Sequence, residues 1–291
     1  MDSDRFLVAL GYHGHAFHGS QIQPDVRTVE GSIRQALQRL SWWEDGCLEM
    51  SSRTDAGVSV RINLARIDLP TPVSKQASEA SILRALNDNL PVGVVALSTN
   101  RAPSDSRVRY ADLRTYLFRL ETIEEWPFEP EVGQLTEACS MVEGEHDFSN
   151  LSRLEDGRDP VRKVESCNPW IYPDGRPIGF SIEARSFVWN QVRRIASAFS
   201  GIASGRIGIS DLQHALENPG VSIDLGRAPS EGLVLWSISH PDFVSGMSDV
   251  LPSGSTFTSR PEDPREYRRW MSMAGYEMSS ILESEWMSRL S

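Results

Sequence analysis

Apolar residues follow two spacings along roughly the first hundred residues, and their order predicts the local structure. Short runs dominated by apolar side chains are typical of strands, whereas apolar residues three or four positions apart indicate one face of a helix. The predicted strands cover residues 6–10, 47–51, 60–69 and 94–99, and the predicted helices cover 29–40 and 78–86. The order is therefore strand, helix, strand, strand, helix, strand.

The same order recurs after an arginine-rich connection. The predicted strands cover residues 116–120, 164–172, 178–184 and 232–239, and the predicted helices cover 135–142 and 187–202. Pro173-Asp174-Gly175-Arg176 joins two of these strands and favours a hairpin turn. Ser210-Asp211-Leu212-Gln213 has capping-box spacing and adds a short helix. The doubled β-α-β-β-α-β order predicts an α+β fold of two ferredoxin-like halves, whose antiparallel sheets face a central cleft.

Beyond His240 the composition turns to Ser, Gly, Pro and Asp, which predicts a linker over residues 241–261. A helix follows, because Asp263 can cap it, Pro264 suits its first position and Glu266 suits its third. We expect this helix to pack on the body of the protein or on a partner chain rather than to contact a substrate. The chain is thereby divided into an N-terminal half (1–103), a C-terminal half (104–246), and a linker with a C-terminal helical extension (247–291).

Length and composition indicate a folded, soluble protein. The chain has 291 residues, of which 40% are hydrophobic, enough for a sizeable core. No apolar run approaches the roughly 20 residues that cross a bilayer, and the N-terminus lacks the features of a signal peptide. We therefore expect a cytoplasmic protein. Cys47, Cys139 and Cys167 lie far apart without a CxxC pair, so we expect core residues rather than disulfides or a zinc site.

The charge balance points away from a nucleic-acid partner, but the kind of basic residue points toward one. A net charge of −11 is unusual for a protein that binds RNA. However, lysine occurs only at Lys75 and Lys163, and arginine binds phosphate bidentately and stacks on bases. The arginines gather at residues 101, 107, 109, 114 and 119, and again at 185, 193 and 194. A basic groove on an acidic body and a general preference for Arg, Asp and Glu explain this composition equally well.

One short loop carries the strongest candidate for catalysis. Arg53-Thr54-Asp55-Ala56-Gly57-Val58 places a single carboxylate between an arginine and a glycine among small residues. Such a carboxylate can act as a nucleophile or as a base. Taken alone, the hexamer is more typical of an Asp-Gly turn. The motifs that accompany it make Asp55 the predicted catalytic residue.

Other candidates are weaker. His13, His15 and His18 lie within six positions, as metal ligands often do, but no carboxylate follows at a useful spacing, so we predict no metal. Glu145-His146-Asp147 offers an acid–base trio, yet adjacent residues in a loop rarely converge on one point, so a capping or turn role is favoured. The chain has no Gly-x-Ser-x-Gly elbow and no glycine-rich phosphate loop, which argues against a serine hydrolase or a kinase.

Together these segments resemble the TruA-type tRNA pseudouridine synthases over residues 6 to about 240. The resemblance implies an archaeal-like member of that family. The matching motifs are Tyr12-His13-Gly14-His15-Ala16-Phe17-His18-Gly19-Ser20-Gln21-Ile22-Gln23 with Thr28-Val29-Glu30, Arg53-Thr54-Asp55-Ala56-Gly57-Val58, Ala85-Leu86-Asn87 with Leu90-Pro91, Arg114-Thr115-Tyr116, His146-Asp147-Phe148, Phe187-Val188-Trp189-Asn190-Gln191-Val192-Arg193, and Ala228-Pro229-Ser230-Glu231-Gly232-Leu233. Each motif alone is weak, but seven in register are a strong signal. The family usually has an aspartate at His13, a tryptophan at Ser20 and a histidine-alanine pair at Ser59-Val60.

The resemblance implies an isomerase that turns uridine in tRNA into pseudouridine without a metal, nucleotide or redox cofactor. The expected targets are positions 38–40 of the anticodon stem-loop. Asp55 is expected to act on the ribose, by attack on the anomeric carbon or by removal of a sugar proton. The base must first be flipped out, which costs a few kcal/mol. In the family, two chains form a homodimer that holds a tRNA, so a homodimer is expected here.

The resemblance also implies roles for other residues. Arg193 is the expected counter-ion of Asp55, Tyr116 the aromatic that stacks on the uracil, and Arg53 the residue that handles the displaced nucleotide. The expected contacts to the RNA backbone are Arg109, Arg114, Arg162 and Lys163. Two alternatives stay open: a non-catalytic RNA-binding protein on the same doubled sheet, and a metal-dependent hydrolase that uses His13, His15 and His18.

Overall fold

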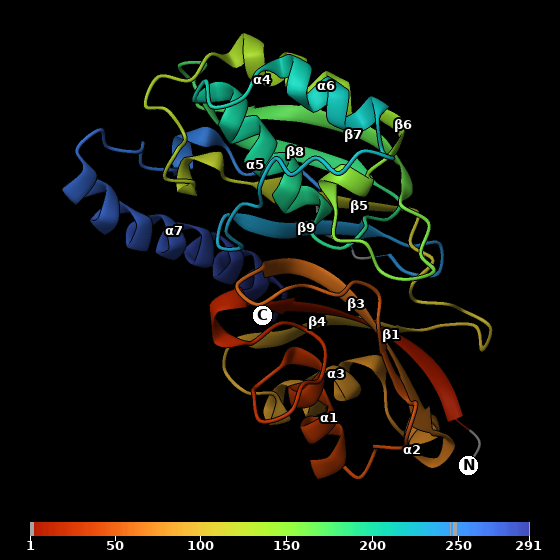
Figure 1. The fold of residues 1–291 in the computed structure, drawn as a ribbon. Helices are drawn as coiled ribbons and strands as arrows, with labels where there is room; N and C mark the ends of the chain where they lie inside the picture. The colour runs from red at the N-terminus through yellow and green to blue at the C-terminus, as the bar shows by residue number, and fades with distance from the viewer. Residues whose placement is uncertain (1–2, 245, 247–248, 291) are drawn as a thin grey trace. The chain divides into compact units, whose positions relative to one another are not determined.

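The computed structural model describes residues 3–244, 246 and 249–290. The chain folds into two compact units, each built from strands and helices (Figure 1). Unit 1 comprises Met1–Asp112, Leu235–Asp249 and Ser279–Ser291, and unit 2 comprises Leu113–Val234 and Val250–Met278. The predicted α+β class is therefore confirmed. Strand β9 (Leu233–Ser239) and helix α7 (Pro264–Leu290) have residues in both units.

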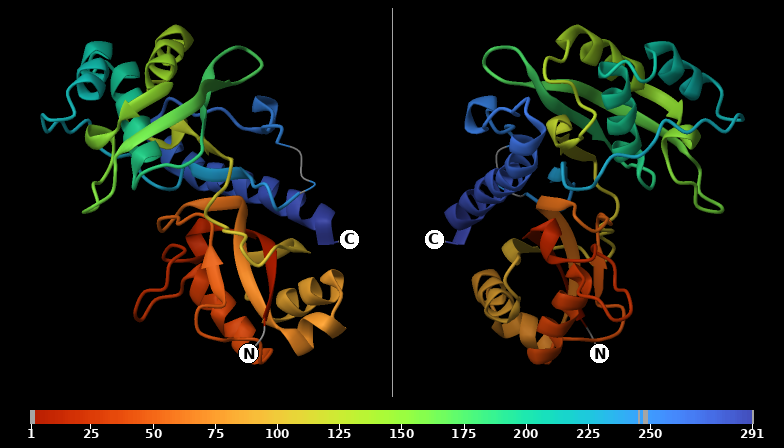
Figure 2. Two further views of the ribbon diagram at one scale, coloured as in Figure 1. Left: turned by 90° about the vertical axis from the view of Figure 1, so that its right-hand side faces the viewer. Right: turned by 60° about the vertical axis from the view of Figure 1, so that its left-hand side comes forward.

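Unit 1 contains an antiparallel sheet. Its strands are β1 (Ser3–Tyr12), β2 (Leu48–Met50), β3 (Ser59–Pro70) and β4 (Val94–Arg101), in the order β4-β1-β3, with β2 paired to β3. β1 is buried along most of its length because β3 and β4 pair with its two edges. Helices α1 (Val29–Arg39) and α3 (Glu79–Asn89) contact each other and lie on the same side of the sheet, and α2 (Thr71–Gln76) follows β3 (Figures 1 and 2).

Unit 2 contains a second set of antiparallel strands. These are β5 (Leu113–Phe118), β6 (Gly144–Asp147), β7 (Val161–Ile171) and β8 (Pro177–Ala184), in the order β5-β8-β7-β6. Helices α4 (Val132–Val142), α5 (Gln191–Ala203) and α6 (Ile209–Glu217) cover one face, and α4 contacts both other helices (Figure 1). The predicted turn is confirmed: the Gly175 N–H donates to the Tyr172 carbonyl, and the Tyr172 N–H donates to the Arg176 carbonyl.

The predicted start of α7 is confirmed by its cap. The Asp263 carboxylate accepts from the N–H groups of Arg265 at 2.8 Å and Glu266 at 3.1 Å. The N-cap of helix α6 lies two residues before the predicted N-cap Ser210: the Asp211 carboxylate accepts from the Gly208 N–H at 2.7 Å, so Gly208 is the N-cap. Local capping chemistry therefore locates both helix starts to within two residues.

Three local predictions were wrong or incomplete. Helix α5 begins at Gln191 rather than at residue 187, because Asn190 has a left-handed backbone with φ 64° and interrupts the helical geometry. The trio Glu145-His146-Asp147 lies in strand β6 rather than in a loop, because its backbone pairs with β7. The predicted capping or turn role holds for Asp147, whose carboxylate accepts from the Ser149 N–H at 2.8 Å. Strand β6 was missed because its polar sequence gives too little apolar periodicity to reveal a short edge strand. Helix α2 was not predicted either.

Part of the predicted linker is packed against the protein. Phe257 is 7% exposed, and the Trp170 indole donates to the Pro252 carbonyl at 2.9 Å. All three cysteines are buried, as predicted for core residues. No helix in the described ranges combines the length and apolar content needed to cross a membrane.

Candidate active site

The loop Arg53–Val58, called the catalytic loop below, lies directly before β3 in unit 1. Asp55 is half-buried and Arg53 is exposed. The loop turns tightly, since the Val58 N–H donates to the Asp55 carbonyl at 3.2 Å and Gly57 has a φ of 87°, which favours glycine. Val58 is 1% exposed and anchors the end of the loop in the core.

The segment Tyr12–Ser20 holds this loop from the other side. Ser20 binds both backbone groups of Thr54: its N–H donates to the Thr54 carbonyl at 3.0 Å, and its hydroxyl accepts from the Thr54 N–H at 2.8 Å. The Tyr12 and Thr54 hydroxyls lie 2.8 Å apart. Burial raises the pKa of Tyr12 to about 12, so the phenol stays protonated at neutral pH. The residue before Asp55 is therefore clamped through its backbone and its side chain.

Gly14 lies directly against the backbone of the catalytic loop. A Cβ on Gly14 would lie 2.3 Å from the carbonyl carbon and oxygen of Gly57, closer than any real contact. The Gly14 N–H donates to the Ser59 hydroxyl at 3.0 Å. In the histidine-rich motif it is thus the glycine that allows the loop to pack, a role the sequence analysis did not assign.

The histidines of that motif do not act as one site. The His13 and His15 rings stack with centroids 5.3 Å apart, and His13 Nε2 lies 2.8 Å from a Glu283 carboxylate oxygen on α7. His18 is exposed. Across the part of the chain that the structure describes, no group of three or more His, Cys, Asp or Glu side chains is placed to hold a metal ion. His13 therefore serves a contact to the C-terminal helix.

The predicted residues of unit 2 form two local arrangements. Tyr116 on β5 is buried and packs edge-to-face on Phe187, with ring centroids 5.2 Å apart. Arg193, in the first turn of α5, donates from Nε to the Ala228 carbonyl at 2.9 Å, and its own carbonyl accepts from the Ala228 N–H at 3.0 Å. The motifs that contain Arg193 and Ala228 are thus joined in unit 2. Asp55 belongs to unit 1, and its pairing with Arg193 stays a prediction.

The predicted RNA-backbone residues differ in exposure. Arg109 and Lys163 are exposed and form ion pairs with Glu49 at 2.8 Å and Glu165 at 2.6 Å. Such surface pairs contribute about 0–1 kcal/mol, so a phosphate can replace the carboxylate at little cost. Arg162 is half-buried and donates to nearby carbonyls. Arg114 is 6% exposed, and its guanidinium donates to the Arg185 carbonyl.

Arg153 and Trp189 form a surface feature of unit 2 that was not predicted from the sequence. The Arg153 guanidinium lies 4.1 Å from the Trp189 ring centroid, and the Arg153 N–H donates to the Trp189 carbonyl at 2.7 Å. Trp189 is 40% exposed. An accessible indole beside a guanidinium is typical of surfaces that stack RNA bases. No signal of this exposure was present in the sequence, because Trp189 lies inside the predicted helix 187–202.

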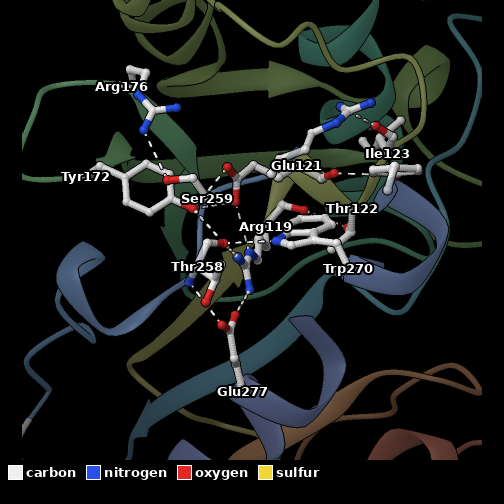
Figure 3. Close-up of polar contacts among 12 residues, drawn as sticks. Arg119, Glu121, Thr122, Ile123, Tyr172, Arg176, Thr258, Ser259, Trp270 and Glu277 are labelled. Carbon is white, nitrogen blue, oxygen red and sulfur yellow. Dashed lines mark hydrogen bonds and ion pairs between the residues drawn. The ribbon is translucent and has the colours of Figure 1, made fainter. Parts of the chain in front are cut away.

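A buried charge cluster lies elsewhere in unit 2, around Arg119 (Figure 3). Arg119 donates to Glu121 at 3.1 Å, to Glu277 at 2.9 Å and to the Thr258 carbonyl at 3.0 Å. Burial lowers the pKa of Arg119, but Glu121 and Glu277 outweigh this and hold it above its usual value. Burial raises the pKa of Glu121, which also accepts from the Tyr172 hydroxyl. The cluster connects segments of unit 2 that are far apart in the sequence, so we infer that it stabilises the fold.

Comparison with known proteins identifies the family. The family described as tRNA pseudouridine synthase matches residues 138–241. A tRNA pseudouridine synthase A of Methanocorpusculum labreanum is 34% identical over 238 residues, which cover 80% of this chain and 79% of that protein. The enzyme of the same name from Thermococcus sibiricus is 33% identical, over 81% of this chain and 85% of that protein.

A third relative extends further along the chain. The tRNA pseudouridine synthase A of Methanosphaerula palustris is 31% identical over 278 residues, covering 94% of this chain and 88% of that protein. Solved structures are less similar: a chain in "Crystal Structure of a Cbf5-Nop10-Gar1 Complex" is 11% identical and covers 67% of this chain and 53% of that chain, with a TM-score of 0.31, too low to inform on the fold. The identity to full-length relatives is decisive, and this chain belongs to the tRNA pseudouridine synthase family and is an isomerase.

Proposed function

We propose that Asp55 is the catalytic residue with which this chain converts uridine in tRNA to pseudouridine. The observation that supports this proposal is the clamped loop. Ser20 binds both backbone groups of Thr54, and Gly14 packs on Gly57, on either side of the carboxylate. Catalysis depends on such fixing, because a misplacement of about 1 Å can cost on the order of a hundredfold in rate.

The chemistry needs only a positioned carboxylate. The bond from uracil N1 to ribose C1′ breaks, a bond from C5 to C1′ forms, and the proton on C5 is lost while N1 gains one. No net oxidation or hydrolysis occurs, so no co-reactant is required. Asp55 acts either by attack on C1′ or by removal of a sugar proton. Arg193 is the proposed counter-ion, since an opposite charge within about 4–6 Å keeps a carboxylate ionised.

The proposed substrate contacts follow the same division of roles. The target uridines are at positions 38–40 of the anticodon stem-loop and are flipped out before reaction. Tyr116 stacks on the flipped uracil. Arg53 takes the place of the flipped base or holds that base out. Arg109, Arg114, Arg162 and Lys163 contact the RNA backbone, which makes binding weaken steeply with salt.

We further propose two ferredoxin-like halves facing a substrate cleft, a homodimer, a cytoplasmic location, and catalysis without metal, nucleotide or redox cofactor. The homodimer is tested by sedimentation equilibrium, which should give twice the mass of the chain. Elemental analysis of purified protein tests the absence of a metal, because stoichiometric zinc or iron would contradict it.

The decisive experiment maps pseudouridine in unmodified tRNA after incubation with the wild type and with Asp55→Asn. The wild type should form pseudouridine at one or more of positions 38–40, and Asp55→Asn should bind the same tRNA but form none. Asp45→Asn, which changes an exposed carboxylate of unit 1, is the matched control and should keep full activity. Activity in Asp55→Asn would overturn the assignment. If the wild type forms no pseudouridine and Asp55→Asn binds RNA as the wild type does, a non-catalytic RNA-binding protein is favoured.

The proposed pairing of Asp55 and Arg193 needs a separate test. In a double-mutant cycle with Asp55→Asn and Arg193→Gln, tRNA affinity is measured for each variant and for the double variant. Non-additive effects support the pair, because the loss of one partner removes the contribution of the other. Strict additivity would show that the two residues act independently.

A further inference from the structure

The last turns of α7 contact unit 1 at the two strand ends beside the catalytic loop. Glu283 lies 2.8 Å from His13, directly after β1. Glu285 accepts from the Arg61 guanidinium at 2.8 and 3.2 Å, and Arg61 is in β3, which begins where the catalytic loop ends. The Trp286 indole N–H donates to the Arg61 carbonyl at 3.1 Å. One helix end thus binds both strands that flank the loop.

Trp286 is the centre of this contact. It is 2% exposed, its ring lies 4.7 Å from the His13 ring, and it rests on the backbone of Gly11. A Cβ on Gly11 would lie 2.3 Å from the Trp286 indole nitrogen and 2.4 Å from an adjacent ring carbon. Gly11 therefore has to be glycine while Trp286 occupies this position, and a large, rigid side chain fixes the end of β1.

The same residues contact the catalytic loop on their other side. His13 binds α7, and the next residue, Gly14, packs on Gly57 and Val58 and donates to Ser59. Tyr12, the residue before His13, contacts Thr54 through its hydroxyl. A displacement of His13 therefore passes to the catalytic loop within one residue in each direction of the chain.

We propose that Glu283 and Trp286 are positioning residues for catalysis: through His13, Gly11 and Arg61 they fix the end of β1, which contacts the catalytic loop, and the start of β3, which follows it. The inference rests on the proposed function of Asp55. Neither residue touches the reacting atoms, so both act on the rate of the bound complex and not on substrate binding. Glu283 and Trp286 then link the last turns of the C-terminal helix to the position of the catalytic loop.

The test measures two quantities for Trp286→Ala and Glu283→Gln: the single-turnover rate of pseudouridine formation at saturating tRNA, and the affinity for tRNA. Both variants should lower the rate, by about tenfold to a hundredfold for Trp286→Ala, and leave affinity within about twofold. Met287→Ala is the matched control, since Met287 is on the same turn and 67% exposed, and it should keep both values.

A second pair of variants separates positioning from loss of folding. Gly11→Ala should slow the reaction strongly in the wild type, because its methyl group displaces the indole. In the Trp286→Ala background the three indole atoms that the methyl group would meet are absent, so it should add almost nothing. Additive effects of the two substitutions would overturn the proposal. Should Trp286→Ala not fold, Glu283→Gln decides the matter, because Glu283 has a 55% exposed side chain and its loss leaves the core intact.

The outcomes distinguish this inference from the function on which it rests. If Asp55→Asn stays active, the proposed function fails. If Asp55→Asn is inactive while Trp286→Ala, Glu283→Gln and Gly11→Ala react at the wild-type rate, the proposed function stands and the positioning role is wrong. A change in tRNA affinity with an unchanged rate at saturation would also overturn it, because it would make the helix a binding element.

Discussion

Two buried arginines, Arg61 in unit 1 and Arg119 in unit 2, are bound by α7 in the same manner. Their side chains are 1% and 2% exposed, and each donates to a carboxylate of the helix, Glu285 or Glu277. Each also lies over aromatic rings: Arg61 is 4.4 Å from the centroid of Trp236, and Arg119 is 4.8 Å from two rings. A buried guanidinium needs such partners, because an unpaired charge in the core is costly.

The two sites differ in how they are closed and in what lies beside them. Arg119 has two nearly buried carboxylates, Glu121 at 5% and Glu277 at 16% exposure, whereas the Glu285 side chain is 40% exposed. Arg61 lies two residues after Ser59, which binds Gly14 beside the catalytic loop. A buried arginine paired with a carboxylate of α7 therefore stabilises unit 2 at Arg119, whereas at Arg61 it lies where it can fix the position of the catalytic loop.

The largest expected effect is on stability at the Arg119 site. Arg119→Leu leaves two carboxylates uncompensated, so the free energy of unfolding should fall by about 3–5 kcal/mol. Arg61→Leu should cost less, about 1–3 kcal/mol, because Glu285 can turn to solvent and mainly hydrogen bonds are lost. Urea unfolding at neutral pH checks both. Equal losses would show that the two sites are closed to the same degree.

The next effect is a difference in pH dependence between Glu277→Gln and Glu285→Gln. Burial raises the pKa of Glu277, but hydrogen bonds from Thr258 and Arg119 outweigh it and hold the pKa below its usual value. A depressed pKa in the folded state means that the charged form stabilises the fold above the ordinary carboxyl pKa of about 4.3, and that this contribution disappears as the pH falls through the folded-state pKa.

Wild type should therefore exceed Glu277→Gln in stability by about 1–3 kcal/mol near neutral pH, with a gap that closes below roughly pH 4. Glu285→Gln should cost less, because the Glu285 side chain is 40% exposed and a glutamine oxygen at this position can still accept from Arg61. Unfolding of all three proteins between pH 3 and 7 gives the comparison. A gap for Glu277→Gln that widens on acidification would contradict the assigned pKa direction.

A small stability effect is expected at Tyr12, beside the catalytic loop. Tyr12→Phe loses the hydrogen bond to Thr54, about 0.5–1.5 kcal/mol. Since burial raises the pKa of Tyr12 to about 12, its contribution should be complete below the unfolded-state value near 10 and should vanish as the pH rises through about 12. Unfolding at pH 8 to 12 measures this. The same variant should slow pseudouridine formation more than Glu277→Gln does, although it costs less stability.

The comparison also shows what the sequence could reveal. The order of strands and helices and the catalytic loop were predictable, because apolar periodicity and capping residues are local signals. The fate of each arginine was not. Arg119 belongs to an arginine-rich stretch for which a basic groove and a general preference for arginine were equally good explanations. Its helix partner Glu277 is 158 residues away, and Glu285 is 224 residues from Arg61. Burial and pairing at such separations are set by tertiary contacts.

The site shows the same limit. Asp55 and the motif around Gly14 and Ser20 were recognisable as motifs, but the clamp on Thr54 could be described only from the folded backbone. The contribution of Trp286 had no signal beyond an apolar position on a predicted helix, because its partner Gly11 lies at the opposite end of the chain. Residues that act through others are the hardest to find in a sequence.

Two matched tryptophans test whether one end of α7 stabilises unit 2 and the other end positions the catalytic loop. Trp270 is 4% exposed and donates to the Thr258 carbonyl beside Arg119, and Trp286 is 2% exposed and donates to the Arg61 carbonyl. The measurement is the single-turnover rate of pseudouridine formation at saturating tRNA for Trp270→Phe and Trp286→Phe. Trp286→Phe should be slower than wild type by about tenfold, and Trp270→Phe should stay within about twofold. Equal rates in the two variants would contradict the account.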